Sequence, residues 1–182
     1  MKRLSVFLAE GFEEIEALSV VDICRRAQID VSMVSVTGQK MVTGAHGIAV
    51  CADEVFENMD FDAVDGIVLP GGMPGTLNLQ NHQGVVEQVQ VFAQKGKLTA
   101  AICAAPSVLA NAGVLFGKMA TVYPGCEVAG CDVTWLTDAT VRTNHIITGK
   151  GPGVAALFAL EIVGYLQGEA MKQEVKDGLM LA

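Results

Sequence analysis

Short apolar runs alternate with longer amphipathic stretches along most of the chain. Residues 3–9, Gly66–Leu69 and Leu98–Ile102 are almost continuously apolar, which is typical of strands buried on both faces of a sheet. Between them, residues 14–27 and 83–95 carry apolar side chains at the spacing of an amphipathic helix. The alternation therefore predicts parallel strands that are connected by helices.

The first predicted helix, residues 14–27, is expected to turn Ile15, Leu18, Val21 and Ile23 toward the core. Residues 37–47 are rich in glycine and predict a short hairpin or an excursion at the sheet edge, and the acidic residues 53–65 predict a surface segment. Further strands are expected at residues 30–36, 48–51, 119–122, 133–136, 140–142 and 145–148, and further helices at 107–112, 154–166 and 170–179.

These elements predict an α/β fold with a doubly wound, mainly parallel sheet that is sandwiched by helices. Since no repeat, low-complexity tract or linker divides the chain, we expect a single domain over residues 1–182. Ligand sites in such sheets lie at the carboxyl ends of the strands. Three polar or glycine-rich segments fall at predicted strand ends: residues 10–16, 70–75 and 103–106.

Composition and charge exclude several classes of function. Of the 182 residues, 51% are apolar, and the net charge is −8. Since lysine and arginine form no cluster, we expect no nucleic-acid partner. No apolar run reaches the length of a membrane span, and Glu10 interrupts the apolar start too early for a signal peptide, so we expect a cytoplasmic protein without a membrane partner.

The five cysteines are odd in number and widely spread, which indicates free thiols and not a disulfide scaffold. Cys126 and Cys131 are separated by four residues. Two free thiols in a loop are the favoured interpretation, and a local redox pair is the alternative. Their spacing does not match a zinc knuckle, and the chain has no phosphate-binding glycine motif, so we expect no metal and no cofactor.

Cys103 stands where the strand Leu98–Ile102 turns into a predicted helix. Pro106 suits the first turn of that helix, and the small neighbour Ala104 leaves the sulfur uncrowded. The positive end of the helix dipole would favour a thiolate over a thiol. A reactive cysteine is one interpretation of this turn, and a buried structural cysteine is the other.

A nucleophilic thiolate also needs an oxyanion pocket and a proton shuttle. The backbone N–H groups of Gly71, Gly72 and Ala104 could form the pocket. Glu13, Glu14 and Glu16 offer carboxylates, of which a productive partner must be buried and protonated, because a charged carboxylate would oppose the thiolate. The alternative is that these glutamates only complement the helix dipole. His46, His82 and His145 show no spacing that defines a Cys–His pair.

Four motifs resemble those of the ThiJ/DJ-one/PfpI superfamily, in its DJ-one branch. They occur in order as Ala9-Glu10-Gly11-Phe12-Glu13-Glu14-Ile15-Glu16, Val68-Leu69-Pro70-Gly71-Gly72, Ala101-Ile102-Cys103-Ala104-Ala105-Pro106 and Lys150-Gly151-Pro152-Gly153. The resemblance covers nearly the whole chain. It implies a flavodoxin-like fold and a homodimer, with Cys103 as the reactive cysteine, Glu16 as its protonated partner, and Gly72 and Ala104 at the oxyanion pocket.

The sequence departs from this family pattern at three positions. Tyr123 replaces a histidine that human-type members carry near the cysteine, and a phenol is a poor base near neutral pH. His46 aligns with a positive charge that relatives contribute across the dimer interface, and is a weaker, pH-dependent substitute. Ala104 replaces the histidine of the protease-like branch, which argues against peptidase or amidotransferase activity.

The resemblance implies a cysteine-dependent stress-response enzyme that acts on small reactive carbonyls, such as methylglyoxal or early glycation adducts. Cys103 would add to the aldehyde and Glu16 would move the proton, as in a cofactor-free glyoxalase or deglycase. The alternative is a redox sensor or a redox-regulated chaperone that works through oxidation of Cys103. No residue supports the thiamine-related role that the superfamily name evokes.

Overall fold

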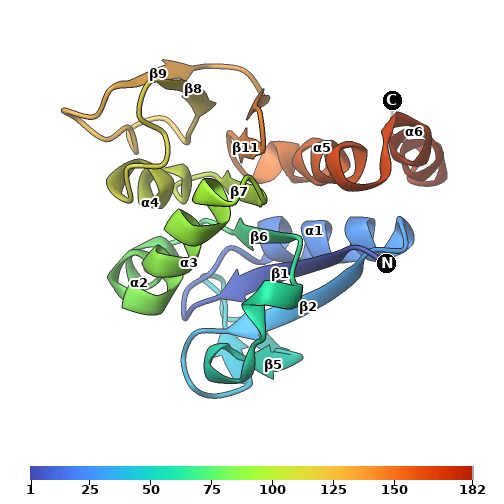
Figure 1. Cartoon of the computed structure of the whole chain (residues 1–182). Helices are drawn as coiled ribbons and strands as arrows, with labels where there is room; N and C mark the ends of the chain where they lie inside the picture. The colour runs from blue at the N-terminus through green and yellow to red at the C-terminus, as the bar shows by residue number, and fades with distance from the viewer. Residues whose placement is uncertain (182) are drawn as a thin grey trace.

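A computed structural model describes residues 1–181. Within this range, seven strands form the central sheet in the order β10-β11-β7-β6-β1-β2-β5 (Figure 1). All neighbouring strands are parallel except β10 and β11, which pair antiparallel at one edge. The strands are β1 (Arg3–Leu8), β2 (Asp30–Ser35), β5 (Glu54–Val55), β6 (Gly66–Leu69), β7 (Leu98–Ile102), β10 (Thr140–Thr143) and β11 (Ile146–Gly149).

Two small strand pairs lie outside the main sheet, β3 (Met41–Thr43) with β4 (Ala49–Cys51) and β8 (Lys118–Thr121) with β9 (Val133–Leu136). The helices are α1 (Glu14–Arg26), α2 (Gly75–Asn81), α3 (Gln83–Gln94), α4 (Pro106–Asn111), α5 (Ala155–Gln167) and α6 (Glu169–Gly178), with 3₁₀ turns at Phe56–Asn58, Phe61–Ala63 and Pro152–Val154.

The sheet separates two layers of apolar side chains. In β1, Leu4 and Val6 face the layer that holds α1 and α5, whereas Phe7 faces the layer that holds α2, α3 and α4. Successive side chains of a strand point to opposite faces, so an apolar run can fill both layers at once. The predicted α/β fold with a mainly parallel sheet between helices is confirmed.

The buried face of α1 differs from the predicted one. Val21 and Ile23 are buried as expected, but Ile15 and Leu18 are 59% and 36% exposed. The helix is rotated so that Glu16 is completely buried, as its expected role as the protonated partner of Cys103 requires. A polar group in the core of a helix face is a sign of function rather than of packing.

Two other elements, α2 and β5, differ from the predictions. Helix α2 was not predicted, because its short sequence is mostly polar and its apolar residues pack against α3, which follows it directly, and against the more distant α4. Strand β5 lies within the acidic segment that was expected only at the surface. Strand β8, where a strand was predicted at residues 119–122, pairs with β9 in a separate two-stranded ribbon. No helix in residues 1–181 combines the length and the hydropathy needed to cross a membrane.

Candidate active site around Cys103

Cys103 occupies a constrained turn directly after β7. Its φ is +63°, in the left-handed region that non-glycine residues rarely adopt. Two backbone hydrogen bonds hold the turn: Cys103 N–H donates to Gly149 O at 2.9 Å, and Tyr123 N–H donates to Cys103 O at 2.8 Å. Backbone strain of this kind persists only where the surrounding structure enforces it, and it is concentrated at functional sites.

Glu16 extends from the first turn of α1 into the interior. Gly71 N–H donates to its Oε2 atom at 2.7 Å, and within residues 1–181 its buried Oε1 atom has no hydrogen-bond partner. Burial raises the pKa of Glu16 to about 7, and the charge of Glu13 adds to this rise, whereas hydrogen bonds with Gly71 and Cys103 oppose it. A carboxyl group with this pKa can both take up and release a proton near neutral pH.

Gly71 is the point at which Cys103 and Glu16 meet. A Cβ atom added to Gly71 would lie 2.7 Å from the Cys103 Cβ atom and 2.8 Å from Glu16 Oε2. The structure thus brings together the two residues that the family motifs pair. It also gives Gly71 a different role from the one expected, because its N–H group holds Glu16 and is not free to bind an oxyanion.

The Cys103 thiol is partly buried, and its pKa is raised to about 12 by burial and by the neighbouring Glu16 carboxylate. The backbone N–H groups of Ala104 and Gly72 interact with the sulfur and oppose this rise. The predicted lowering of the pKa by the helix start is therefore outweighed while Glu16 is ionised. Because the protonation of each group affects the other, Cys103 and Glu16 titrate as a coupled pair. Protonation of Glu16 removes the negative charge that disfavours the Cys103 thiolate.

Gly72 fixes the loop that carries its N–H group to the sulfur. Its φ is +91°, and an added Cβ atom would lie 2.5 Å from both Glu13 N and Gly11 O. Only glycine fits this conformation and this close backbone approach. Gly72 and Ala104 are therefore the two expected oxyanion donors whose N–H groups the structure directs at Cys103.

An open groove of about 580 Å³ adjoins the Cys103 turn. It is lined by Tyr123, Pro124 and residues 150–154. Tyr123, which is 48% exposed, is linked to the site by its backbone hydrogen bond to Cys103 O. Cys103 is not among the lining residues, so the groove meets the Cys103 turn only through Tyr123, whose side chain is part of its wall.

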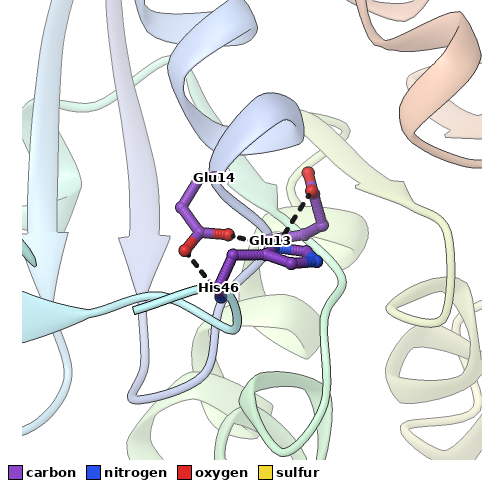
Figure 2. Close-up of side chains that lie close together, drawn as sticks. All are labelled: Glu13, Glu14 and His46. Carbon is purple, nitrogen blue, oxygen red and sulfur yellow. Dashed lines mark hydrogen bonds and ion pairs between the residues drawn. The ribbon is translucent and has the colours of Figure 1, made fainter. Parts of the chain in front are cut away.

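His46 does not belong to the immediate surroundings of Cys103. Its Nδ1 atom lies 2.8 Å from Glu14 Oε2 and 3.8 Å from Glu13 Oε1, and its side chain is 69% exposed (Figure 2). The Glu14 carboxylate raises the pKa of His46. Burial would raise the pKa of Glu14, but hydrogen bonds from His46 outweigh burial and lower it. A role for His46 across a dimer interface stays a prediction.

The sequence grouped Glu13, Glu14 and Glu16 as equivalent candidates, but the structure separates them. Glu13 caps α1, where its Oε2 atom accepts from Glu16 N at 2.8 Å, and Glu14 turns toward His46. No spacing in the sequence could have indicated the contact between Glu14 and His46, which are 32 residues apart. All five cysteines are free thiols, including Cys126 and Cys131.

Comparison with known proteins places these motifs in a family. Residues 2–164 match the DJ-1/PfpI family. The chain belongs to this family. It is 36% identical to Protein dj-1beta from Drosophila melanogaster, over 100% of this chain and 98% of the relative.

Solved structures of DJ-1 proteins share the whole fold. A C103A mutant of a DJ-1 superfamily protein from Salmonella typhimurium has a TM-score of 0.95 and 32% identity, over 100% of both chains. An oxidized DJ-1 from Toxoplasma gondii has a TM-score of 0.93 and 31% identity, again over 100% of both chains. The family resemblance of the four sequence motifs is thereby confirmed, together with the flavodoxin-like arrangement.

Proposed function

We propose that this DJ-1/PfpI protein is a stress-response enzyme that converts small reactive carbonyls through Cys103 without a cofactor. The observation that carries the proposal is the Glu16 carboxyl group, which Gly71 N–H holds beside Cys103 in a buried position. A nucleophile beside a group that can transfer its proton forms the minimal apparatus for addition to an aldehyde.

The first step is the addition of Cys103 to the aldehyde carbon of methylglyoxal. The sulfur forms a bond to this carbon as the thiol proton passes to the Glu16 carboxylate. The electron pair of the C=O bond moves to the oxygen, and the N–H groups of Gly72 and Ala104 stabilise the resulting oxyanion. Glu16 then returns its proton to that oxygen, which gives a hemithioacetal on Cys103.

The second step moves a proton between the two carbons of the adduct. Glu16 removes the hydrogen from the former aldehyde carbon, and an enediol forms. The proton is delivered to the neighbouring carbon, which leaves a lactoyl thioester on Cys103. Water hydrolyses the thioester and restores the thiol. The sum is methylglyoxal plus water giving lactate, so no oxidant or reductant is consumed. An early glycation adduct would give the same hemithioacetal if the Cys103 sulfur replaced the amine of the adduct, which leaves with the thiol proton.

Lactate formation from methylglyoxal in the presence of a chelator tests this proposal. We expect activity in the wild type and in Cys51→Ala, which removes an exposed cysteine away from the site, and none in Cys103→Ala. Glu16→Gln keeps the shape of the side chain but cannot carry the proton, so we expect kcat to fall by about 10²–10⁴-fold. Equal turnover in wild type and Cys103→Ala would refute the mechanism.

The second candidate is a redox sensor that works through the same sulfur. The relative from Toxoplasma gondii is described as oxidized, which favours this alternative. Hydrogen peroxide would oxidise the Cys103 thiolate to a sulfenate with release of water, and a second peroxide would give the sulfinate and another water. We expect intact and peptide mass spectra to show oxygen addition at Cys103 before the other four cysteines. If Cys103 is the last to react, the sensor is excluded.

A further inference from the structure

Glu13 is a buried carboxylate that takes no part in the steps of the proposed reaction. Only 10% of its side chain is exposed, and it caps α1 by accepting from Glu16 N–H at 2.8 Å. Aspartate, asparagine, serine and threonine are the residues preferred at this position, and a neutral acceptor is sufficient for a cap. Because burial of a charged side chain costs free energy, a buried glutamate exceeds what the cap requires.

Three hydrogen bonds connect Glu13, Glu16 and Gly71 in a closed ring. Glu16 N–H donates to Glu13 Oε2 at 2.8 Å, and Gly71 N–H donates to Glu16 Oε2 at 2.7 Å. Glu13 N–H donates in turn to Gly71 O at 2.9 Å. The ring fastens the first turn of α1 to the loop after β6, and all of its atoms belong to one chain. Removal of the Glu13 carboxyl group would open the ring at the backbone of Glu16.

Glu13 and Glu16 also form a pair of neighbouring carboxyl groups. Residues three positions apart on a helix lie next to each other, and like charges at this spacing disfavour each other. Glu16 is completely buried, whereas Glu13 is at the helix start, where the N–H groups of the first turn favour an anion. Carboxyl groups whose surroundings differ in this way take different roles, one as a fixed charge and one as the carrier of a proton.

The charged and titratable groups that face this pair come from three parts of the chain. His46, on the loop after β3, places Nδ1 3.8 Å from Glu13 Oε1 and 2.8 Å from Glu14 Oε2 (Figure 2). Cys103 faces Glu16 from the turn after β7. Burial is the main cause of the raised pKa of Glu16, and the charge of Glu13 contributes to it. Glu13 therefore influences the proton that Glu16 exchanges with Cys103.

We propose that Glu13 is a positioning residue for the Cys103 site. Its carboxylate holds Glu16 in place through the ring of hydrogen bonds, and its negative charge shifts the shared proton from the Cys103 sulfur toward the Glu16 carboxylate. In that transfer the S–H bond breaks and an O–H bond forms on Glu16. This inference rests on the proton transfer in the proposed function. The alternative is that Glu13 only caps α1 and complements its dipole.

Carbon-13 NMR of the glutamate carboxyl groups tests the effect of the Glu13 charge. The signal of Glu16 is identified by its loss in Glu16→Gln. Glu13→Gln keeps the length of the side chain and an oxygen that can accept from Glu16 N–H, but it carries no charge. We therefore expect the titration midpoint of Glu16 to move to lower pH in Glu13→Gln, because a neighbouring negative charge has been removed.

Alkylation of Cys103 by iodoacetamide measures the other member of the pair. A weaker base at Glu16 leaves more of the shared proton on the sulfur, so less thiolate is available. We expect alkylation of the Cys103 peptide, followed by mass spectrometry at pH 7, to slow by about three- to tenfold in Glu13→Gln. Glu13→Asp restores a charge at the cap and should return both measurements toward the wild-type values.

Glu14→Gln is the matched control, since it removes a charge from the adjacent residue, which contacts His46. It should leave the Glu16 midpoint and the alkylation rate unchanged. The family resemblance implies a homodimer, so light scattering and urea unfolding should confirm that all variants are compared in the same oligomeric and folded state. The hydrogen bonds of the ring lie within one chain and are the same in either oligomeric state.

An unchanged Glu16 midpoint in Glu13→Gln would overturn the proposal and leave Glu13 as a helix cap. An equal shift in Glu14→Gln would also overturn it, because the effect would then not be specific to Glu13. Neither measurement requires turnover of a carbonyl. A wild-type protein that forms no lactate would therefore refute the proposed function, whereas the titration of Glu16 would still decide the role of Glu13.

Discussion

Two backbone positions decide the chemistry of the Cys103 site at the residue scale. Cys103 is held at φ +63°, and Gly71 leaves the gap through which the thiol and the Glu16 carboxyl interact. Burial raises the pKa of Glu16 to about 7, and burial together with ionised Glu16 raises the pKa of Cys103. The pair is therefore adapted to exchange a proton, and it is not a thiolate that is permanently stabilised by a helix dipole.

Substitution of Gly71 by alanine tests this arrangement. The new Cβ atom would lie 2.7 Å from the Cys103 Cβ atom and 2.8 Å from Glu16 Oε2. We expect the free energy of unfolding to fall by about 1–3 kcal/mol, as at other overpacked sites. We also expect activity to fall by more than the decrease in the folded fraction accounts for. Urea unfolding and lactate formation measure the two effects.

Gly178→Ala is the matched control for Gly71→Ala, because an added Cβ atom there meets nothing within 4 Å. It should leave activity unchanged. Normal turnover in Gly71→Ala would mean that Cys103 and Glu16 need not approach each other as closely as the structure places them.

At the element scale, Asp65, which lies between the 3₁₀ turn Phe61–Ala63 and β6, links neighbouring strands at the amino end of the sheet. Asp65 accepts from Arg3 N–H at 2.8 Å and from Lys2 Nζ at 3.1 Å through its carboxylate. Its backbone joins β1 and β7, since Asp65 N–H donates to Arg3 O and Leu98 N–H donates to Asp65 O. One residue thus aligns three strands at the end opposite the active site.

The charge of Asp65 predicts a pH-dependent contribution to stability. Burial would raise the pKa of Asp65, but the Arg3 N–H group and Lys2 outweigh burial and lower it. A group whose pKa is lowered on folding stabilises the fold above its unfolded pKa, about 3.9, and this stabilisation is lost as the pH falls through the folded pKa. Asp65→Asn should therefore be less stable than the wild type at pH 7, with a difference that shrinks toward pH 3.

Urea unfolding at both pH values measures this difference. Glu57→Gln, which removes a charge from an exposed side chain, should change stability little at either pH. A difference between Asp65→Asn and the wild type that stays constant with pH would show that the Asp65 charge does not stabilise the fold.

At the scale of the whole molecule, some large apolar side chains lie outside the two buried layers and are exposed at the surface of the single chain. Ile15 and Leu18 of α1 are exposed, and so is Ile48, whose N–H group contacts Glu14 Oε1 at 3.4 Å. Ile48 therefore lies beside the first turn of α1. Single exposed apolar residues are common, but a group on one side of a molecule is typical of an interface.

We propose that a second copy of the chain covers Ile15, Leu18 and Ile48, as the family resemblance implies. Light scattering should then give twice the mass of one chain. Leu18→Lys would place a charge in the interface and should shift the equilibrium toward the monomer. Phe116→Lys changes another exposed residue, 71% accessible, and should leave the mass unchanged. A wild-type protein that is monomeric at micromolar concentration would contradict this expectation.

The sequence by itself determined most of the order of strands and helices, though not α2 or β5, because apolar periodicity and turn residues act over short distances. It also placed Cys103 correctly at a strand end, since the run Leu98–Ile102 and Pro106 define that turn locally. Local patterns failed for α1, where Ile15 and Leu18 are apolar but exposed and Glu16 is polar but buried. Amphipathic spacing gives the period of a helix, but the neighbours that cover it decide which face is buried.

The tertiary structure decided which polar groups meet. Glu16, Gly71 and Cys103 lie close together only because β1, β6 and β7 pair in parallel, so that the segments after these strands meet at the carboxyl end of the sheet. The same holds for Glu14 and His46, which are distant in the sequence and in contact in the fold. The pKa values of Glu16 and Cys103 followed from that placement, because burial and the distance between charges are properties of the folded chain and not of the residue types.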